Sequence, residues 1–122
     1  MVKVHALKRT STLALRKRKA ALLRQFRVPT NLLHASFIEQ YLKCGKSNCR
    51  CTQGRKHGPF YYLARCLAAD LIQKFLLKTP QQQHHARQGI KAYGQLQSFL
   101  EELSQINSEL LRRDEPLRCP EG

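Results

Sequence analysis

The sequence is poor in acidic residues. Eight Asp and Glu stand against 22 Lys and Arg among 122 residues, which gives a formal net charge of +14. Residues 1–29 contain no acid, and none occurs between Glu39 and Asp70. A surplus of this size keeps a small protein soluble but opposes its compaction through self-repulsion. We therefore expect a polyanionic partner, for which DNA, RNA and an anionic membrane surface are the candidates.

Long hydrophobic runs are also missing. No apolar stretch approaches the roughly 18 residues that a membrane-spanning helix needs, and the first residues lack the apolar core of a secretory signal. Clustered cysteines without an export signal are typical of a reducing compartment, so we expect a cytoplasmic protein. The Arg-rich, acid-free start also has the composition of a mitochondrial transit peptide, which is the alternative.

Signatures of catalysis are absent as well. Before residue 100 the only carboxylates are Glu39 and Asp70, too few for two-carboxylate or two-metal chemistry. The chain has no H-E-x-x-H or H-x-E motif, in which a glutamate serves a zinc ion as general base. It also lacks a Walker-type phosphate loop. These absences predict a binding protein and not an enzyme.

What the sequence does contain is a cluster of cysteines. Residues 44–57 read CGKSNCRCTQGRKH and place Cys44, Cys49, Cys51 and His57 at the spacing C-x4-C-x-C-x5-H. Thiolate and imidazole are the ligands that zinc prefers, and four of them make a closed tetrahedral structural site. We predict one structural Zn²⁺ per chain, held by these four residues. Gly58, next to the last ligand, can adopt a positive φ at little cost.

Two other interpretations of the cysteines stay open. The thiols could carry no metal, or they could serve a redox or disulfide role. Cys66 is the reserve fourth ligand in place of His57, although its position in an apolar run is more typical of a small buried side chain.

The stretch CGKSNCRCTQGRKHGPFYYL resembles an uncharacterised family of small bacterial and archaeal zinc-loop domains, with the signature CGKxxCRCxxGxxHGPYYYL. The resemblance covers roughly Ser36 to Arg113. It implies a helix that enters the cysteine loop, a β-hairpin after it, and a last helix rich in Leu and Glu. It also implies a bacterial or archaeal protein encoded near transposons or other mobile elements. Residues 66–71, CLAADL, depart from the Gly/Lys/Arg-rich hairpin turn of that family.

The residue pattern predicts an α+β fold that begins with two helices. A basic helix is expected over residues 12–27, capped by Ser11 or Thr12 and stopped by Pro29. A solvated basic arm is the alternative for this segment. A short amphipathic helix is expected over residues 31–42, leading into the metal loop.

Two strands and a long helix complete the predicted fold. Residues 60–67 and 71–77 have the composition of an antiparallel hairpin, although the second run could equally be a short buried helix. A long amphipathic helix opens at Thr79-Pro80 and ends near Arg112. The expected domains are a basic arm over 1–29, a zinc-loop domain over 30–113 and a disordered tail over 114–122.

Two groups of basic side chains are the predicted nucleic-acid contacts. They lie on the first helix and around the metal loop: Arg16, Lys17, Arg18, Lys19, Arg24, Arg27, Lys43, Lys46, Arg50, Arg55 and Lys56. A loop fixed by a metal would hold its cations in one place, as phosphate contacts need. Neutralisation of the zinc–thiolate charge is the alternative for the loop group. The analogy with mobile elements favours DNA over RNA.

The last helix has a heptad pattern. Tyr93, Leu100 and Asn107 take position a, and Leu96, Leu103 and Leu110 take position d. Such a stripe can cover the hairpin and the short helix, or it can form a coiled-coil seam with a second copy. The second functional possibility is an adaptor that uses this helix to join a recombinase or nuclease. A basic protein of the membrane surface or the ribosome is the third possibility, although we expect no membrane partner.

Overall fold

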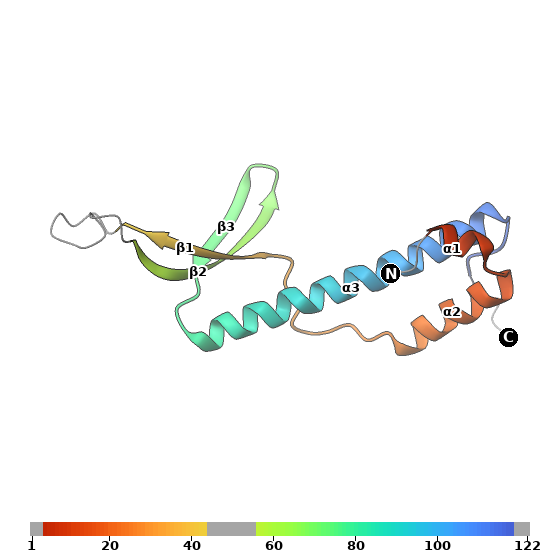
Figure 1. Ribbon diagram of the computed structural model, residues 1–122, viewed down its shortest axis with the longest axis horizontal. Coiled ribbons are helices and arrows are strands. Elements are labelled where there is room, and N and C mark those ends of the chain that lie inside the picture. The colour runs from red at the N-terminus through yellow and green to blue at the C-terminus, as the bar shows by residue number, and fades with distance from the viewer. Residues whose placement is uncertain (1–3, 44–55, 119–122) are drawn as a thin grey trace. The chain divides into compact units, whose positions relative to one another are not determined.

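The computed structural model describes residues 4–43 and 56–118 (Figure 1). Its elements in chain order are α1 (Val4–Arg9), α2 (Thr12–Gln25), β1 (Ser36–Leu42), β2 (His57–Ala68), β3 (Leu71–Leu76) and α3 (Pro80–Arg112). The predicted α+β class is confirmed. Contacts divide the chain into a first unit, Met1–Pro29 with Gly94–Gly122, and a second unit, Thr30–Tyr93. The N-terminal segment thus shares a unit with the second half of α3.

The basic helix α2 begins and ends through local signals. Its N-cap is Ser11, whose Oγ accepts a hydrogen bond from the Ala14 N–H at 3.1 Å. Leu, Ala, Lys and Arg, all good helix formers, make up most of its interior. The backbone becomes extended at Phe26, so the helix ends before Pro29 is reached. The preceding helix α1 was not among the predicted elements.

The core of the first unit is aliphatic. It joins the three helices of that unit through Leu7, Leu15, Leu22, Ile106 and Leu110. Its three most deeply buried side chains, Leu15, Ile106 and Leu110, are almost wholly removed from water. Phe99 packs against this cluster and stacks on Phe26, with ring centroids 4.5 Å apart.

The predicted short helix over residues 31–42 is wrong, because residues 36–42 form strand β1. This strand pairs antiparallel with β2, from Ser36 opposite Ala64 to Leu42 opposite His57. Its Phe, Ile and Tyr residues favour a strand once a partner is present, and a segment this short has no decisive helical period. The partner strand follows the cysteine loop, so local pattern alone could not reveal it.

The predicted hairpin is confirmed, and it belongs to an antiparallel sheet of order β1-β2-β3. β2 pairs with β3 from Tyr62 opposite Leu76 to Ala68 opposite Leu71, with an irregularity between Cys66 and Ala68. The structure thereby gives the register of a hairpin whose CLAADL segment departs from the turn of the resembled family.

Helix α3 runs over 33 residues, as predicted, and is capped at both ends. The Thr79 hydroxyl accepts from the Gln82 N–H at 3.0 Å while the Gln82 side chain accepts from the Thr79 N–H, a reciprocal capping box. At the other end Asp114 has φ 58°, and the Glu115 N–H donates to the Leu110 carbonyl at 2.9 Å. No helix in the described part of the chain combines the length and hydrophobicity needed to cross a bilayer.

The core of the second unit lies between the first half of α3 and one face of the sheet. Its buried members are Leu63, Leu77 and Ala86, with Leu33, Ala35, Phe37, Tyr61 and Ile90 packed against them. The Arg87 guanidinium lies over the Phe37 ring, 4.4 Å from its centroid. The helix therefore covers the face of the sheet that carries Phe37, Tyr61 and Leu63.

Candidate metal loop and nucleic-acid interface

The predicted metal loop connects the ends of two paired strands. Leu42, the last residue of β1, is paired with His57, the first residue of β2. Lys43 and Lys56 flank the connection and are exposed. The other predicted residues of this loop lie outside the described residues: the ligands Cys44, Cys49 and Cys51, and the cations Lys46, Arg50 and Arg55. Of the four predicted ligands the structure thus describes His57 alone.

A glycine is required directly after His57. Gly58 has φ 147°, a conformation that residues with a side chain rarely adopt, and this is the positive φ expected from the sequence. A Cβ at this position would lie 2.8 Å from Cδ1 of Tyr41 and 2.9 Å from the carbonyl oxygen of Gln40. The close approach of β1 therefore leaves no room for a side chain where the chain leaves the loop.

The described residues contain no cluster of metal-ligating side chains. Over residues 4–43 and 56–118, no three His, Cys, Asp or Glu side chains come together as a ligand group. His84 and His85 are exposed near the start of α3, with ring centroids 6.0 Å apart. Cys66 is exposed near the far end of β2, where its thiol donates to the Ala68 carbonyl at 3.2 Å.

The predicted nucleic-acid contacts on α2 and directly after it fall into two groups. Arg16 pairs with Glu115 at 3.2 Å, and Arg18 holds both carboxylate oxygens of Glu102 at 2.8 and 3.0 Å. Lys19 is only 7% exposed. Its amine donates to Asn107 Oδ1 at 2.7 Å and to the Leu117 carbonyl. These three cations are thus engaged within the first unit.

The second group faces solvent. Lys17 and Arg24 are exposed, and no carboxylate of the described residues pairs with either. Arg27 is exposed too and donates to the backbone carbonyls of Arg24 and Phe26. Lys17 and Arg24 are therefore the cations of α2 that can meet a phosphate without breaking a contact seen here.

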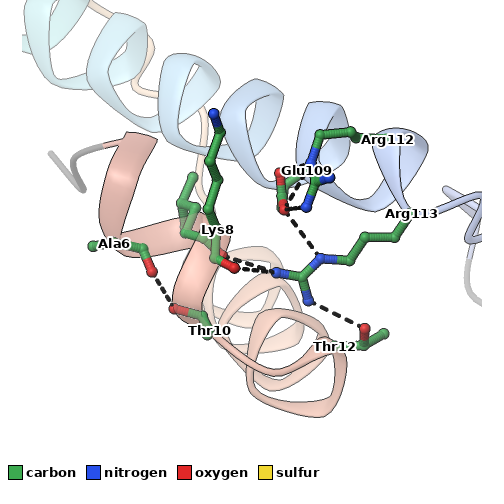
Figure 2. A network of polar contacts seen from close by, with 8 residues as sticks. Ala6, Lys8, Thr10, Thr12, Glu109, Arg112 and Arg113 are labelled. Atoms are coloured by element: carbon green, nitrogen blue, oxygen red, sulfur yellow. Dashed lines mark hydrogen bonds and ion pairs between the residues drawn. The ribbon is translucent and has the colours of Figure 1, made fainter.

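A buried carboxylate organises the end of α3 (Figure 2). Arg112 lies 2.6 Å and Arg113 3.0 Å from Glu109 Oε1. Hydrogen bonds from these guanidiniums, that of Arg112 above all, lower the pKa of Glu109 from 4.5 to about 2, although burial opposes the shift. Arg113 also donates to the Leu7 carbonyl at 3.0 Å and to the Thr12 hydroxyl at 3.2 Å.

Comparison with protein families finds one match in this chain. Residues 12–65 match the Domain of unknown function (DUF6788). The matched segment runs from the start of α2 into β2 and includes all four predicted zinc ligands. No curated protein and no solved structure matches the chain.

The role of two buried carboxylates that pair with arginines was not predicted from the sequence. Glu102 and Glu109 are buried in the first unit and neutralise Arg18, Arg112 and Arg113. The available signal was their seven-residue spacing, which places both acids on one face of a helix, close to the apolar stripe.

Proposed function

We propose that the protein binds nucleic acid, with DNA as its ligand, and that one structural zinc ion stabilises its loop. The observation that carries the proposal is the distribution of charge. The second unit contains ten Lys or Arg and two Asp or Glu, a net charge of +8. The four ion pairs that join two described residues all belong to the first unit. The surplus on the second unit supports an external polyanion as partner.

The pairing of the strands supports zinc as the metal. Leu42 lies opposite His57, so the segment with three cysteines begins and ends at neighbouring points of the sheet. His57, the proposed fourth ligand, stands at one of these points. Three thiolates and one imidazole suit zinc better than magnesium or calcium, which prefer oxygen. Cys66 lies nine residues further along β2, roughly 30 Å at the usual strand rise, so His57 is the better fourth ligand.

Metal analysis tests the zinc site. We expect about one equivalent of zinc per chain, and we expect Cys49→Ser to lose both the metal and the cooperative melt, because ligand binding is part of the folding energy of such loops. Cys66→Ser is the matched control and should keep the zinc and the melting temperature. Metal-free protein with an unchanged melt would rule out the zinc site and leave nucleic-acid binding to be judged separately.

Salt-dependent binding tests the nucleic-acid function. Affinities for duplex DNA, single-stranded DNA and structured RNA are measured over a range of salt concentrations. If about six phosphates are neutralised, the log–log slope on duplex DNA should be about −5, with a smaller slope on a single strand. Absence of binding to all three nucleic acids at low salt would contradict the proposal.

Two sets of α2 variants separate surface charge from folding. Replacing Lys17 and Arg24 with Gln should make the slope on duplex DNA shallower by about 2, because each contact releases about one counterion, and should leave the melt unchanged. Arg18→Gln is the control. It leaves the buried Glu102 carboxylate unpaired and should lower the melting temperature more than it changes the slope.

A protein-interaction adaptor is the second candidate function. Leu100 is 50% and Leu111 65% exposed on α3, which leaves two large apolar side chains on the helix surface for a partner to bury. An adaptor would bind a partner helix, such as one of a recombinase or nuclease, with little dependence on salt. Neither function uses a catalytic step, so we also propose that the protein is not an enzyme.

A further inference from the structure

The two faces of the sheet differ in what covers them. Paired residues of neighbouring strands point to the same face, so Phe37, Leu63 and Phe75 share one face, and Ile38, Tyr62 and Leu76 share the other. The first set belongs to the side on which α3 packs. The second set defines the open face of the sheet.

The open face is apolar and aromatic, with one cation near its centre. Its central side chains are Ile38, Gln40, Phe60, Tyr62, Lys74 and Leu76, and none of them is buried. The Lys74 amine lies over the Tyr62 ring, 4.6 Å from its centroid, and donates to Gln40 Oε1 at 3.0 Å. Residues from all three strands thus meet around Tyr62. The strand positions that make up this face include no carboxylate.

The two aromatic rings are spaced for separated bases. Phe60 and Tyr62 lie two residues apart on one strand, which places them about 6.7 Å apart along β2. Bases stacked in a duplex rise by only about 3.4 Å. Each ring can therefore take one base of an extended single strand, whereas a duplex hides the flat surfaces of its bases inside the stack.

The charges beside the rings suit a phosphate backbone. Lys74 projects from the open face, and the exposed Lys43 and Lys56 follow β1 and precede β2 at the end of the sheet nearest Phe60. A phosphate is a stronger partner for the Lys74 amine than an aromatic ring or a neutral amide, so the amine can leave Tyr62 when a base arrives. Aromatic rings flanked by lysines form the usual surface for single strands.

We propose that the open face of the sheet is a binding site for single-stranded DNA, in which Phe60 and Tyr62 each stack on one base and Lys74 holds the backbone. This proposal rests on the nucleic-acid function above and narrows it to an unpaired strand. The choice of DNA follows the function proposed above, and oligouridylate in the test below compares it with RNA.

The first test removes each ring without removing charge. Zinc-loaded full-length protein is titrated with oligothymidylate of about 15 nucleotides, within the range of known single-strand sites. Phe60→Leu and Tyr62→Leu should each weaken binding by roughly 5- to 150-fold, the range for loss of one stacked base. The salt slope should not change. Tyr62→Phe keeps the ring and should keep the affinity.

The matched control lies on the opposite face of the same sheet. Phe75 is 43% exposed and its side chain lies on the side of α3, so Phe75→Leu should leave the affinity unchanged. Melting temperatures of all variants show whether a loss of binding is a loss of fold. Tryptophan fluorescence can report stacking directly, because the chain contains no tryptophan and an introduced one would be the sole emitter of its kind. The emission of Tyr62→Trp should be quenched by oligothymidylate, and that of Phe75→Trp should not.

The possible failures can be told apart. Binding that is salt-dependent but unaffected by Phe60→Leu and Tyr62→Leu would overturn the site and leave the nucleic-acid function standing. Tighter binding of duplex DNA or of oligouridylate than of oligothymidylate would overturn the choice of ligand. A dimer that dissociates in Tyr62→Leu would show that a second copy covers the open face. Failure to bind any nucleic acid would remove the function and the site together.

Discussion

Two glycines of α3 lie in opposite packing environments. A Cβ on Gly89 would lie 2.6 Å from the Asn31 carbonyl oxygen and 2.7 Å from Cδ1 of Leu33, whereas a Cβ on Gly94 would meet nothing within 4 Å. The Leu33 N–H also donates to the Gly89 carbonyl at 3.1 Å, which holds the two backbones together. Gly89 is therefore a packing requirement, and Gly94 is not.

Alanine substitutions at these glycines should change stability in opposite directions. We expect Gly89→Ala to lower the free energy of unfolding by about 1–3 kcal/mol, because a backbone carbonyl has to move. Gly94→Ala should raise it by about 1 kcal/mol, since alanine is the better helix former. Urea unfolding of zinc-loaded protein measures both. Equal stabilisation by the two substitutions would mean that residues 31–33 do not approach α3 this closely.

At the scale of elements, Glu109 and Arg113 join the end of α3 to α1 and α2. Arg113 donates to the Leu7 carbonyl and to the Thr12 hydroxyl while Glu109 holds its guanidinium in place (Figure 2). The link depends on an ionised carboxylate, because a protonated Glu109 would face two guanidiniums with one acceptor fewer. The stability of the first unit should therefore depend on acid pH.

The direction of that dependence follows from the pKa of Glu109. Its folded value, about 2, lies below the ordinary 4.5, so the stabilisation is complete above pH 4.5 and is lost as the pH falls from 4.5 to about 2. Urea unfolding across this range measures the loss. Acid would also protonate the proposed zinc ligands, so the informative comparison is with Glu109→Gln, whose stability should fall less steeply. Identical slopes for the two proteins would contradict the assigned role of Glu109.

The elements that could be predicted from the sequence are those with local causes. α2 and α3 follow from a helical period and from caps within four residues, and the hairpin of β2 and β3 follows from two apolar runs beside a short turn. β1 could not be predicted this way, because its strand conformation depends on pairing with β2 across the cysteine loop. In a short segment, pairing with a neighbouring strand outweighs a weak helical pattern.

The same distinction between local and long-range causes applies to the candidate site. The zinc ligands follow from residue type and spacing, which are local, and their assignment remains a prediction. The basic residues of α2 looked equivalent in sequence, yet Arg18 and Lys19 find partners 84 and 88 residues away and Lys17 does not find one among the described carboxylates. The open face of the sheet could not be predicted either, because the residues that share it are known only once the register of the three strands is known.

For the whole molecule, the heptad pattern of α3 bears on whether two copies of the chain associate. Three of its six heptad positions, Tyr93, Asn107 and Leu110, have partners within the units. Leu110 is fully buried in the first unit, and Asn107 accepts a hydrogen bond from Lys19. Tyr93 stacks on His34 in the second unit, with centroids 4.4 Å apart. An asparagine with an internal partner is not available to fix the register of a coiled coil, so we expect a monomer.

Two glutamate substitutions on α3 test the expected monomer. Leu100 is 50% exposed and Ile106 is fully buried, although both belong to the apolar stripe. We expect Leu100→Glu to leave the sedimentation mass and the melt unchanged, because its charge stays in water. Ile106→Glu places a charge in the core of the first unit and should unfold it. If instead the wild-type protein sediments as a dimer and Leu100→Glu halves its mass while staying folded and zinc-loaded, the exposed leucines form a seam between copies. That result would favour the adaptor function.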